Sequence, residues 1–221
     1  MESKLLQSRP RAALFLALTC MVSACAGSET ESVAEDHSGV EGPTETLLDS
    51  IPEIMKAADV PGLQIAVLES GEIVATRAFG TTSTESGAPV TDATVFEAAS
   101  LSKPVFAYAV LRMADRGEWD LDQPLWEILE YERLAHDERA RQITSRQVLT
   151  HTTGLPNWGG TPLQFNSDPG ERWNYSGEGF VYLQRAVEKQ TGLTLEEIGT
   201  REVFEPLGMN STHYAWVNAY D

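Results

Sequence analysis

The sequence predicts an α/β fold in which an antiparallel sheet is flanked by helices and a helical subdomain follows. Two β-rich runs at 63–68 and 73–79 are joined by the polar turn 69–72, Glu-Ser-Gly-Glu, which predicts a hairpin. Before the hairpin, residues 44–58 repeat apolar side chains at helical spacing and end close to a Pro-Gly pair. After the hairpin, helices and loops account for most of the chain.

The most apolar helix is predicted for residues 100–116. Its side chains are apolar on nearly all sides, which is typical of a buried helix. Pro104 is tolerated only in or beside a first turn, so the helix begins close to Ser100. Gly117 ends it.

Short helices separated by loops are predicted downstream. Thr144 and Gln147 form a capping-box pattern ahead of a helix at 145–149. Apolar residues at helical spacing predict a further helix at 177–191. A second capping pattern begins at Thr194 and precedes the last predicted helix.

The composition argues against nucleic-acid binding and against a membrane-spanning helix. The formal net charge is −17 over 221 residues, whereas nucleic-acid binding needs a basic surface. No apolar run is long enough for a permanent membrane helix.

The N-terminus carries an export signal. Basic residues precede a short apolar run at 12–22, so residues 1–24 are predicted to be a signal peptide. The sequence Val-Ser-Ala-Cys at its end resembles a bacterial lipobox, which predicts cleavage before Cys25 and a lipid on its sulfur. The alternative is a simple secretory signal cut near Ala24 or Ala26. In either case we expect an exported protein of the cell envelope, lipid-anchored or periplasmic, that touches the membrane only through this lipid.

Residues 25–43 are acidic and polar and are predicted to be a flexible tether, which leaves residues 44–221 as the folded domain. Both cysteines, Cys20 and Cys25, lie before this domain. The domain therefore contains no disulfide and no thiol metal site.

Ser100 and Lys103 are the most informative pair. Three positions apart on a helix, their side chains lie on one face. A serine hydroxyl becomes a strong nucleophile when a base takes its proton, and an amine in a partly dehydrated cleft gives up its own proton more easily than in water. The N-terminus of a helix also favours developing negative charge. The pattern predicts nucleophilic catalysis; the alternative is a helix-capping serine beside a solvated lysine.

Five blocks along the chain resemble the serine beta-lactamase-like hydrolases. They are Pro61-Gly-Leu63, Ser100-x-x-Lys103, Leu149-Thr-His-Thr-Thr-Gly-Leu155, Pro169-Gly-Glu-Arg-Trp-Asn-Tyr-Ser-Gly177 and Leu207-Gly-Met209. The group includes class C beta-lactamases, D-alanyl-D-alanine carboxypeptidases and related esterases. The resemblance implies a beta-lactamase/transpeptidase-like fold and a small-molecule ester or amide substrate, with no metal or organic cofactor.

The resemblance also implies roles for individual residues. Ser100 would be the acylated nucleophile, and its backbone N–H would form half of an oxyanion hole. Lys103 would be the base or proton relay, and Tyr175 the second proton carrier. His151 invites a Ser–His interpretation, but its loop favours a hydrogen-bonded structural role.

Two positions near Tyr175 bear on the substrate. Gly177 stands where beta-lactamases and carboxypeptidases have an asparagine that holds the substrate's amide, so the sequence favours ester hydrolysis over beta-lactam or peptide cleavage. Trp158 is predicted to line an acyl pocket, with core packing as the alternative.

A third family motif, Lys or His followed by any residue and Gly on a late strand, has no match after Tyr175. We therefore expect the C-terminal strands of the fold to be missing, either because the chain is the N-terminal portion of a longer enzyme or because it is a truncated product. The alternatives are a penicillin-binding protein, carboxypeptidase or beta-lactamase, and a catalytically inactive fragment or binding lipoprotein. Alone, this chain is expected to have little activity; its oligomeric state is not predicted.

Overall fold

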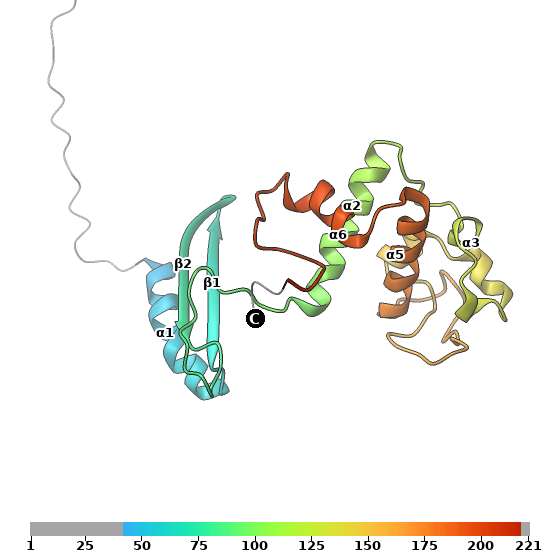
Figure 1. Cartoon of the computed structure of the whole chain (residues 1–221). Helices are drawn as coiled ribbons and strands as arrows, with labels where there is room; N and C mark the ends of the chain where they lie inside the picture. The colour runs from blue at the N-terminus through green and yellow to red at the C-terminus, as the bar shows by residue number, and fades with distance from the viewer. Residues whose placement is uncertain (1–41, 218–221) are drawn as a thin grey trace, which may run out of the picture. The chain divides into compact units, whose positions relative to one another are not determined.

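The computed structural model describes residues 42–217 (Figure 1). The predicted signal peptide, Cys25 and almost all of the predicted tether lie outside the described residues. The chain divides into two units, residues 1–49 and residues 50–221. The described part of the first unit is the beginning of α1 (Pro43–Ala58), the helix predicted for residues 44–58.

The predicted hairpin is confirmed. β1 (Gly62–Glu69) and β2 (Glu72–Gly80) pair antiparallel and form the two-stranded sheet of the described residues. Ser70 and Gly71 connect them with φ angles of +52° and +86°, as in the two-residue turns that match the twist of paired strands. Neither strand buries a side chain fully.

The helix predicted at 100–116 begins with a tight 3₁₀ turn, Ala99–Leu101, and continues as α2 (Ser102–Asp115). Pro104 accounts for this beginning. It has no N–H to donate to the carbonyl of Ser100, four residues earlier, and in the turn before it the N–H of Ser102 donates to the carbonyls of Ala99 and Ser100.

The prediction that α2 is buried on nearly all sides is only half right. One side packs into the core through Phe106, Ala109, Val110 and Met113. Leu101, Tyr108 and Leu111 are exposed, because no element among the described residues covers this second side.

Short helices build the region after α2. Both predicted capping boxes are present, at Thr144 and Thr194. The helices are α3 (Leu125–Ile128), α4 (Ser145–Leu149), α5 (Gly177–Thr191) and α6 (Leu195–Gly199), with 3₁₀ turns at Glu132–Leu134 and Glu138–Gln142 and a π-helical turn at Thr200–Phe204. Within residues 42–217, no helix is long and apolar enough to span a bilayer.

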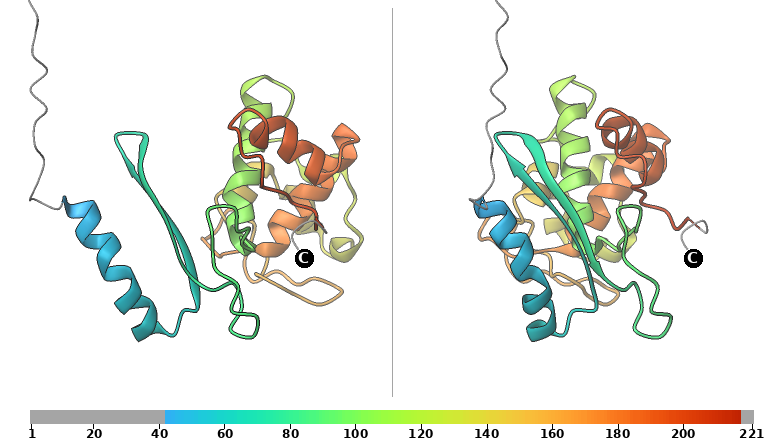
Figure 2. Two further views of the ribbon diagram at one scale, coloured as in Figure 1. Left: turned by 60° about the vertical axis from the view of Figure 1, so that its left-hand side comes forward. Right: turned by 90° about the vertical axis from the view of Figure 1, so that its left-hand side faces the viewer.

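The core of this region forms around α2 and α5. α5 packs on α3 and α4, and α2 packs on α6 and the π-helical turn (Figure 2). Fully buried side chains at these contacts include Met113, Leu125, Leu134, Ile143, Tyr182, Leu183 and Ile198.

A buried carboxylate ties the end of α2 to the π-helical turn. Glu202 is 2% exposed and accepts hydrogen bonds from Arg116 at 2.9 and 2.8 Å and from Arg201 at 2.8 Å. Burial by itself would raise the pKa of Glu202, but these arginines lower it below the ordinary value of 4.5. The carboxylate is therefore charged near neutral pH.

Candidate active site

The structure brings Ser100 and Lys103 together at the beginning of α2. Lys103 Nζ donates a hydrogen bond to Ser100 Oγ at 3.2 Å. The Ser100 side chain is exposed and that of Lys103 is half-buried, so the hydroxyl can be approached from solvent while the amine is partly shielded. One turn of helix thus places a hydroxyl and an amine within hydrogen-bond distance of each other.

The backbone just before Ser100 is in an unusual conformation. Ala99 has a φ of +44°, in the left-handed region that costs a residue with a Cβ about 1–2 kcal/mol. Such strain is found most often at functional sites, where the surrounding structure maintains it. It places Ser100 at the junction between a loop and the helix.

Tyr175 completes the cluster from the loop before α5. Lys103 Nζ lies 5.3 Å from the centre of the Tyr175 ring. Hydrogen bonding to Ser100 and to Lys103, together with the positive charge of Lys103, lowers the pKa of the Tyr175 phenol below its ordinary value of 10.0. The phenol therefore releases its proton at a lower pH than a tyrosine in water.

The residue after Tyr175 is firmly held. Ser176 is the N-cap of α5, and its Oγ accepts a hydrogen bond from the N–H of Gly179 at 2.9 Å. The same hydroxyl donates to the carbonyl of Pro156 at 2.9 Å. The helix cap therefore fixes the chain on one side of the phenol.

His151 does not take part in a Ser–His pair. Its Nδ1 accepts a hydrogen bond from the N–H of Ser176 at 3.0 Å, and its ring lies against that of Tyr175, with centres 4.5 Å apart. Burial, and secondarily the charge of Lys103, lower the pKa of His151 below its ordinary value of 6.5. The hydrogen-bonded role predicted for this histidine agrees with its position.

Gly177 is the first residue of α5, and another side chain fills the space beside it. A Cβ on Gly177 would lie 2.8 Å from the carbonyl oxygen of Asn157 and 2.9 Å from its Oδ1. Asn157 Oδ1 accepts a hydrogen bond from the N–H of Gly177 at 3.1 Å. A carboxamide therefore lies beside this position, but it comes from a different loop. Sequence reasoning missed Asn157; its place directly after the Leu155-Pro156 pair is the signal that could have found it.

Trp158 borders the same cluster. Its side chain is 65% exposed, which excludes the core-packing alternative, and its ring centre lies 6.0 Å from Lys103 Nζ. The loop that carries it is anchored by Arg133, which donates to the carbonyl of Gly159 at 2.7 Å and forms an ion pair with the buried Glu178. Trp158 is thus held as an exposed apolar wall beside Lys103.

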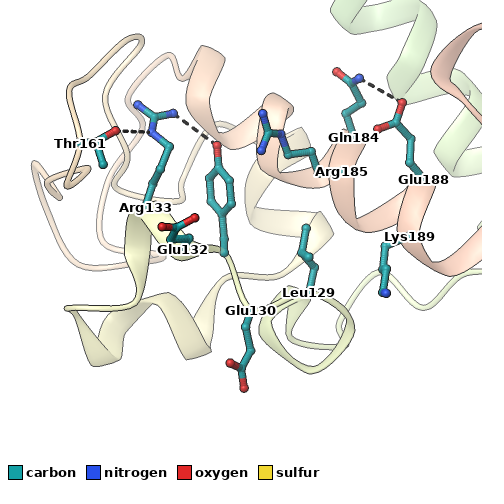
Figure 3. Close-up of a pocket in the computed structure, with 10 residues that line it drawn as sticks. Leu129, Glu130, Glu132, Arg133, Thr161, Gln184, Arg185, Glu188 and Lys189 are labelled. Atoms are coloured by element: carbon teal, nitrogen blue, oxygen red, sulfur yellow. Dashed lines mark hydrogen bonds between the residues drawn. The ribbon is translucent and has the colours of Figure 1, made fainter.

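The described residues also form a depression that lies apart from this cluster. A shallow depression near α5 is bordered by charged side chains of both signs, including Glu132, Arg133, Arg185 and Lys189 (Figure 3). None of its lining residues belongs to the Ser100 cluster. Among residues 42–217, no group of His, Cys, Asp and Glu side chains could hold a metal ion.

Comparison with known families identifies the fold. Residues 48–219 match the family model described as Beta-lactamase. The chain belongs to the beta-lactamase family. The family membership predicted from the five sequence blocks is confirmed. The relatives of this chain include serine hydrolases.

Two relatives show the range of names in the family. A penicillin-binding protein of Bacillus subtilis is 28% identical over 197 residues, which cover 71% of this chain and 42% of the relative. The esterase EstB of Burkholderia gladioli is 31% identical over 196 residues, which cover 73% of this chain and 49% of the relative. The chain therefore spans less than half the length of these relatives.

Solved structures agree on the fold. The penicillin-binding protein homologue from Pyrococcus abyssi superposes with a TM-score of 0.66 at 26% identity, over 76% of this chain and 44% of that one. A class C beta-lactamase in complex with cefoxitin gives a TM-score of 0.69 at 23% identity, over 80% of this chain and 52% of that one. The predicted beta-lactamase/transpeptidase-like fold is confirmed.

Proposed function

We propose that this protein is a serine hydrolase that cleaves esters or amides through an acyl-enzyme. The observation that carries the proposal is the grouping of three proton-exchanging side chains: Lys103 Nζ donates to Ser100 Oγ at 3.2 Å and lies 5.3 Å from the centre of the Tyr175 ring, and both residues lower the pKa of the Tyr175 phenol. Each group has a role that general chemistry assigns to it.

The reaction begins when the Ser100 hydroxyl gives its proton to Lys103 or Tyr175 and its oxygen bonds to the substrate's carbonyl carbon. The negative charge that develops on the carbonyl oxygen is favoured by the positive end of the helix dipole at the beginning of α2. The tetrahedral intermediate then expels the alcohol or amine, which takes a proton from the same pair. Water repeats the sequence on the acyl-enzyme, releases the acid and regenerates Ser100.

The wall of the cluster favours small esters with an apolar acyl group. Trp158 offers an exposed aromatic face beside Lys103, and Gly177 contributes no side chain of its own. The named esterase among the relatives is consistent with this preference. The lost carboxamide at position 177 is expected to weaken recognition of an amide side chain by about 1–3 kcal/mol.

The second candidate is a penicillin-binding protein, carboxypeptidase or beta-lactamase. It is favoured by the carboxamide of Asn157, which lies beside Gly177, and by the penicillin-binding protein among the relatives. Incubation with a fluorescent penicillin distinguishes it from the esterase: a stable adduct on Ser100 or hydrolysis of the penicillin supports the second candidate, whereas ester hydrolysis with neither of these supports the first.

The non-enzymatic alternative is a binding lipoprotein that keeps the fold without turnover. The chain spans less than half of its relatives, and we expect little steady-state turnover from it alone. A single acylation step needs only the Ser100 cluster, whereas repeated turnover also needs deacylation and product release. Steady hydrolysis by the isolated chain would contradict this part of the proposal.

The N-terminal segment is proposed to export the protein and anchor it to the cell envelope through a lipid on Cys25. Growth with an alkyne fatty acid, followed by detection of the label, tests this in cells. The label should disappear in Cys25→Ala and persist in the matched Cys20→Ala. An unlabelled wild-type protein with a mass consistent with cleavage near Ala24 or Ala26 would favour the simple secretory signal.

Release of the chromogenic alcohol from a short-chain ester, followed through the first turnover as well as at steady state, tests the proposed activity. Ser100→Ala should abolish hydrolysis, whereas Ser102→Ala, the same change two residues away, should preserve it. Equal turnover by the wild type and Ser100→Ala would rule the assignment out.

A further inference from the structure

His151 holds Tyr175 from three directions. The carbonyl of His151 accepts a hydrogen bond from the N–H of Asn174 at 2.8 Å, and its Nδ1 accepts one from the N–H of Ser176 at 3.0 Å. The residues on both sides of Tyr175 are therefore bound to the same histidine. Its ring also lies against the phenol ring, 4.5 Å between centres at an angle of 33°.

The histidine is itself fixed in place. Its backbone has a φ of +56°, and its ring contacts two further aromatic rings, with centres 5.3 Å from Phe180 and 6.0 Å from Trp173. A bound lone pair on Nδ1 requires that Nδ1 carry no proton, so the neutral ring holds its proton on Nε2. The titratable groups that face the ring are Lys103 and Tyr175; the other two aromatic rings against it, Phe180 and Trp173, do not titrate.

We infer that His151 is a positioning residue that holds the Tyr175 phenol against Ser100 and Lys103, and that it does so only as a neutral imidazole. The inference rests on the proposed function for its effect on catalysis. Its structural part, the placement of the phenol, stands on the contacts alone.

Protonation of His151 would undo the arrangement in two ways. A proton on Nδ1 removes the acceptor for the N–H of Ser176 and leaves two donors facing each other. It also adds a second positive charge near Lys103. Both effects agree with a pKa of His151 that burial and Lys103 lower below the ordinary value of 6.5.

Two substitutions separate the acceptor from the ring. His151→Asn keeps an acceptor oxygen at the same distance from the backbone as Nδ1 and does not titrate, and asparagine tolerates a positive φ better than most residues. His151→Leu keeps apolar bulk but has no acceptor. The wild type and both variants are compared for thermal unfolding, for the pKa of Tyr175, and for the rate at which a fluorophosphonate labels Ser100.

The pKa of Tyr175 is obtained by ultraviolet difference titration against Tyr175→Phe, which cancels the other tyrosines. In His151→Leu it should rise towards the ordinary value, and labelling of Ser100 should slow by roughly 10- to 100-fold, because small misplacements of a reacting group have effects of this size. In His151→Asn the lowered pKa should persist. Its labelling rate should also fall less steeply with acid than that of the wild type, because no imidazole titrates.

A purely structural histidine would change the unfolding temperature in both variants and leave the Tyr175 pKa and the shape of the pH profile unchanged. That result would overturn the inference. If His151→Leu does not fold, His151→Asn decides: an acid profile as steep as that of the wild type contradicts it. If no variant and no wild-type protein is labelled, the proposed function fails, and the Tyr175 titration still tests the placement of the phenol.

Discussion

The helical region and the β-hairpin of this chain differ in how completely they are built. The helical region has fully buried side chains, among them Leu183, and a buried carboxylate, Glu202, that is paired with arginines. The hairpin has no fully buried residue in either strand and no further strand beside it within residues 42–217. A two-stranded hairpin by itself is marginally stable in water.

This difference in packing matters because the three proposed catalytic side chains lie in the helical region. Ser100, Lys103 and Tyr175 lie in or next to α2 and α5, the helices around which the core of this region forms. The hairpin supplies none of these three groups. The cluster can therefore be ordered in this chain even though its sheet is small, and the predictions that follow challenge this contrast from the largest expected effect to the smallest.

Truncation of the helical core should have the largest effect. Leu183→Ala removes a side chain that is 0% exposed, and such changes typically destabilise a fold by about 2–5 kcal/mol. Leu68→Ala is the matched change on the hairpin, where the side chain is 63% exposed; it should alter stability by less than about 0.5 kcal/mol. Urea unfolding followed by circular dichroism measures both, and equal losses would contradict the contrast.

Removal of the buried carboxylate should have the next largest effect. Glu202→Ala removes the buried partner of Arg116 and Arg201, although Arg116 keeps its ion pair with Glu118. We expect a loss of about 2–3 kcal/mol, below the value for a fully buried pair because those arginines are partly exposed. Because the pKa of Glu202 is lowered below 4.5, its contribution is present above that value and is lost as the pH falls through the lowered pKa.

The difference in unfolding free energy between the wild type and Glu202→Ala should therefore shrink at acid pH. Unfolding measured near neutral pH and again below the lowered pKa tests this. A difference that stays constant across that range would show that Glu202 does not act through its charge.

Substitutions of Ala99, whose backbone is strained, should change stability by smaller amounts. Two variants are expected to change it in opposite directions. Ala99→Gly relieves the positive φ and should raise stability by up to about 1 kcal/mol, whereas Ala99→Val should lower it by about 1–2 kcal/mol because a β-branched residue fits this region poorly. Thermal unfolding checks the order of the two variants. A more stable valine variant would mean that the positive φ is not maintained in solution.

The smallest effect is expected for local opening of the hairpin, which should cost little free energy. Amide hydrogens of β1 and β2 should exchange with solvent at nearly the rate of an unfolded chain, while those in the middle of α5 should exchange only through global unfolding. Hydrogen exchange followed by mass spectrometry or NMR resolves the two classes. Strong protection of the strands would show that the hairpin is more stable than its burial implies.

Local sequence signals predicted most elements of the fold. The capping patterns at Thr144 and Thr194 marked the beginnings of two helices, and the Ser70-Gly71 turn marked the hairpin, because these signals depend on residues that are neighbours in the chain. The partial exposure of α2 was not predictable in the same way. Periodicity reports which side chains are apolar, but which of them are covered depends on elements distant in sequence.

The candidate site likewise has residues that the sequence predicted and contacts that it did not. Ser100 and Lys103 could be paired from their spacing, and Tyr175 from the resemblance to a family. The holding of Tyr175 by His151 and the approach of Asn157 to Gly177 depend on how two loops pack against each other. No local pattern encodes those contacts. The positive φ of Ala99 was also unforeseen, since alanine carries no preference for that conformation.

Labelling of Ser100 by a fluorophosphonate, located by mass spectrometry, tests the central claim most directly. The cluster of Ser100, Lys103 and Tyr175 predicts a single labelled site, Ser100, with a rate that falls by about 10²–10⁴-fold in Lys103→Ala, because the serine loses the group that takes its proton. Ser102→Ala should react as the wild type does. An unlabelled wild type, a label on another residue, or an unchanged rate in Lys103→Ala would contradict the account.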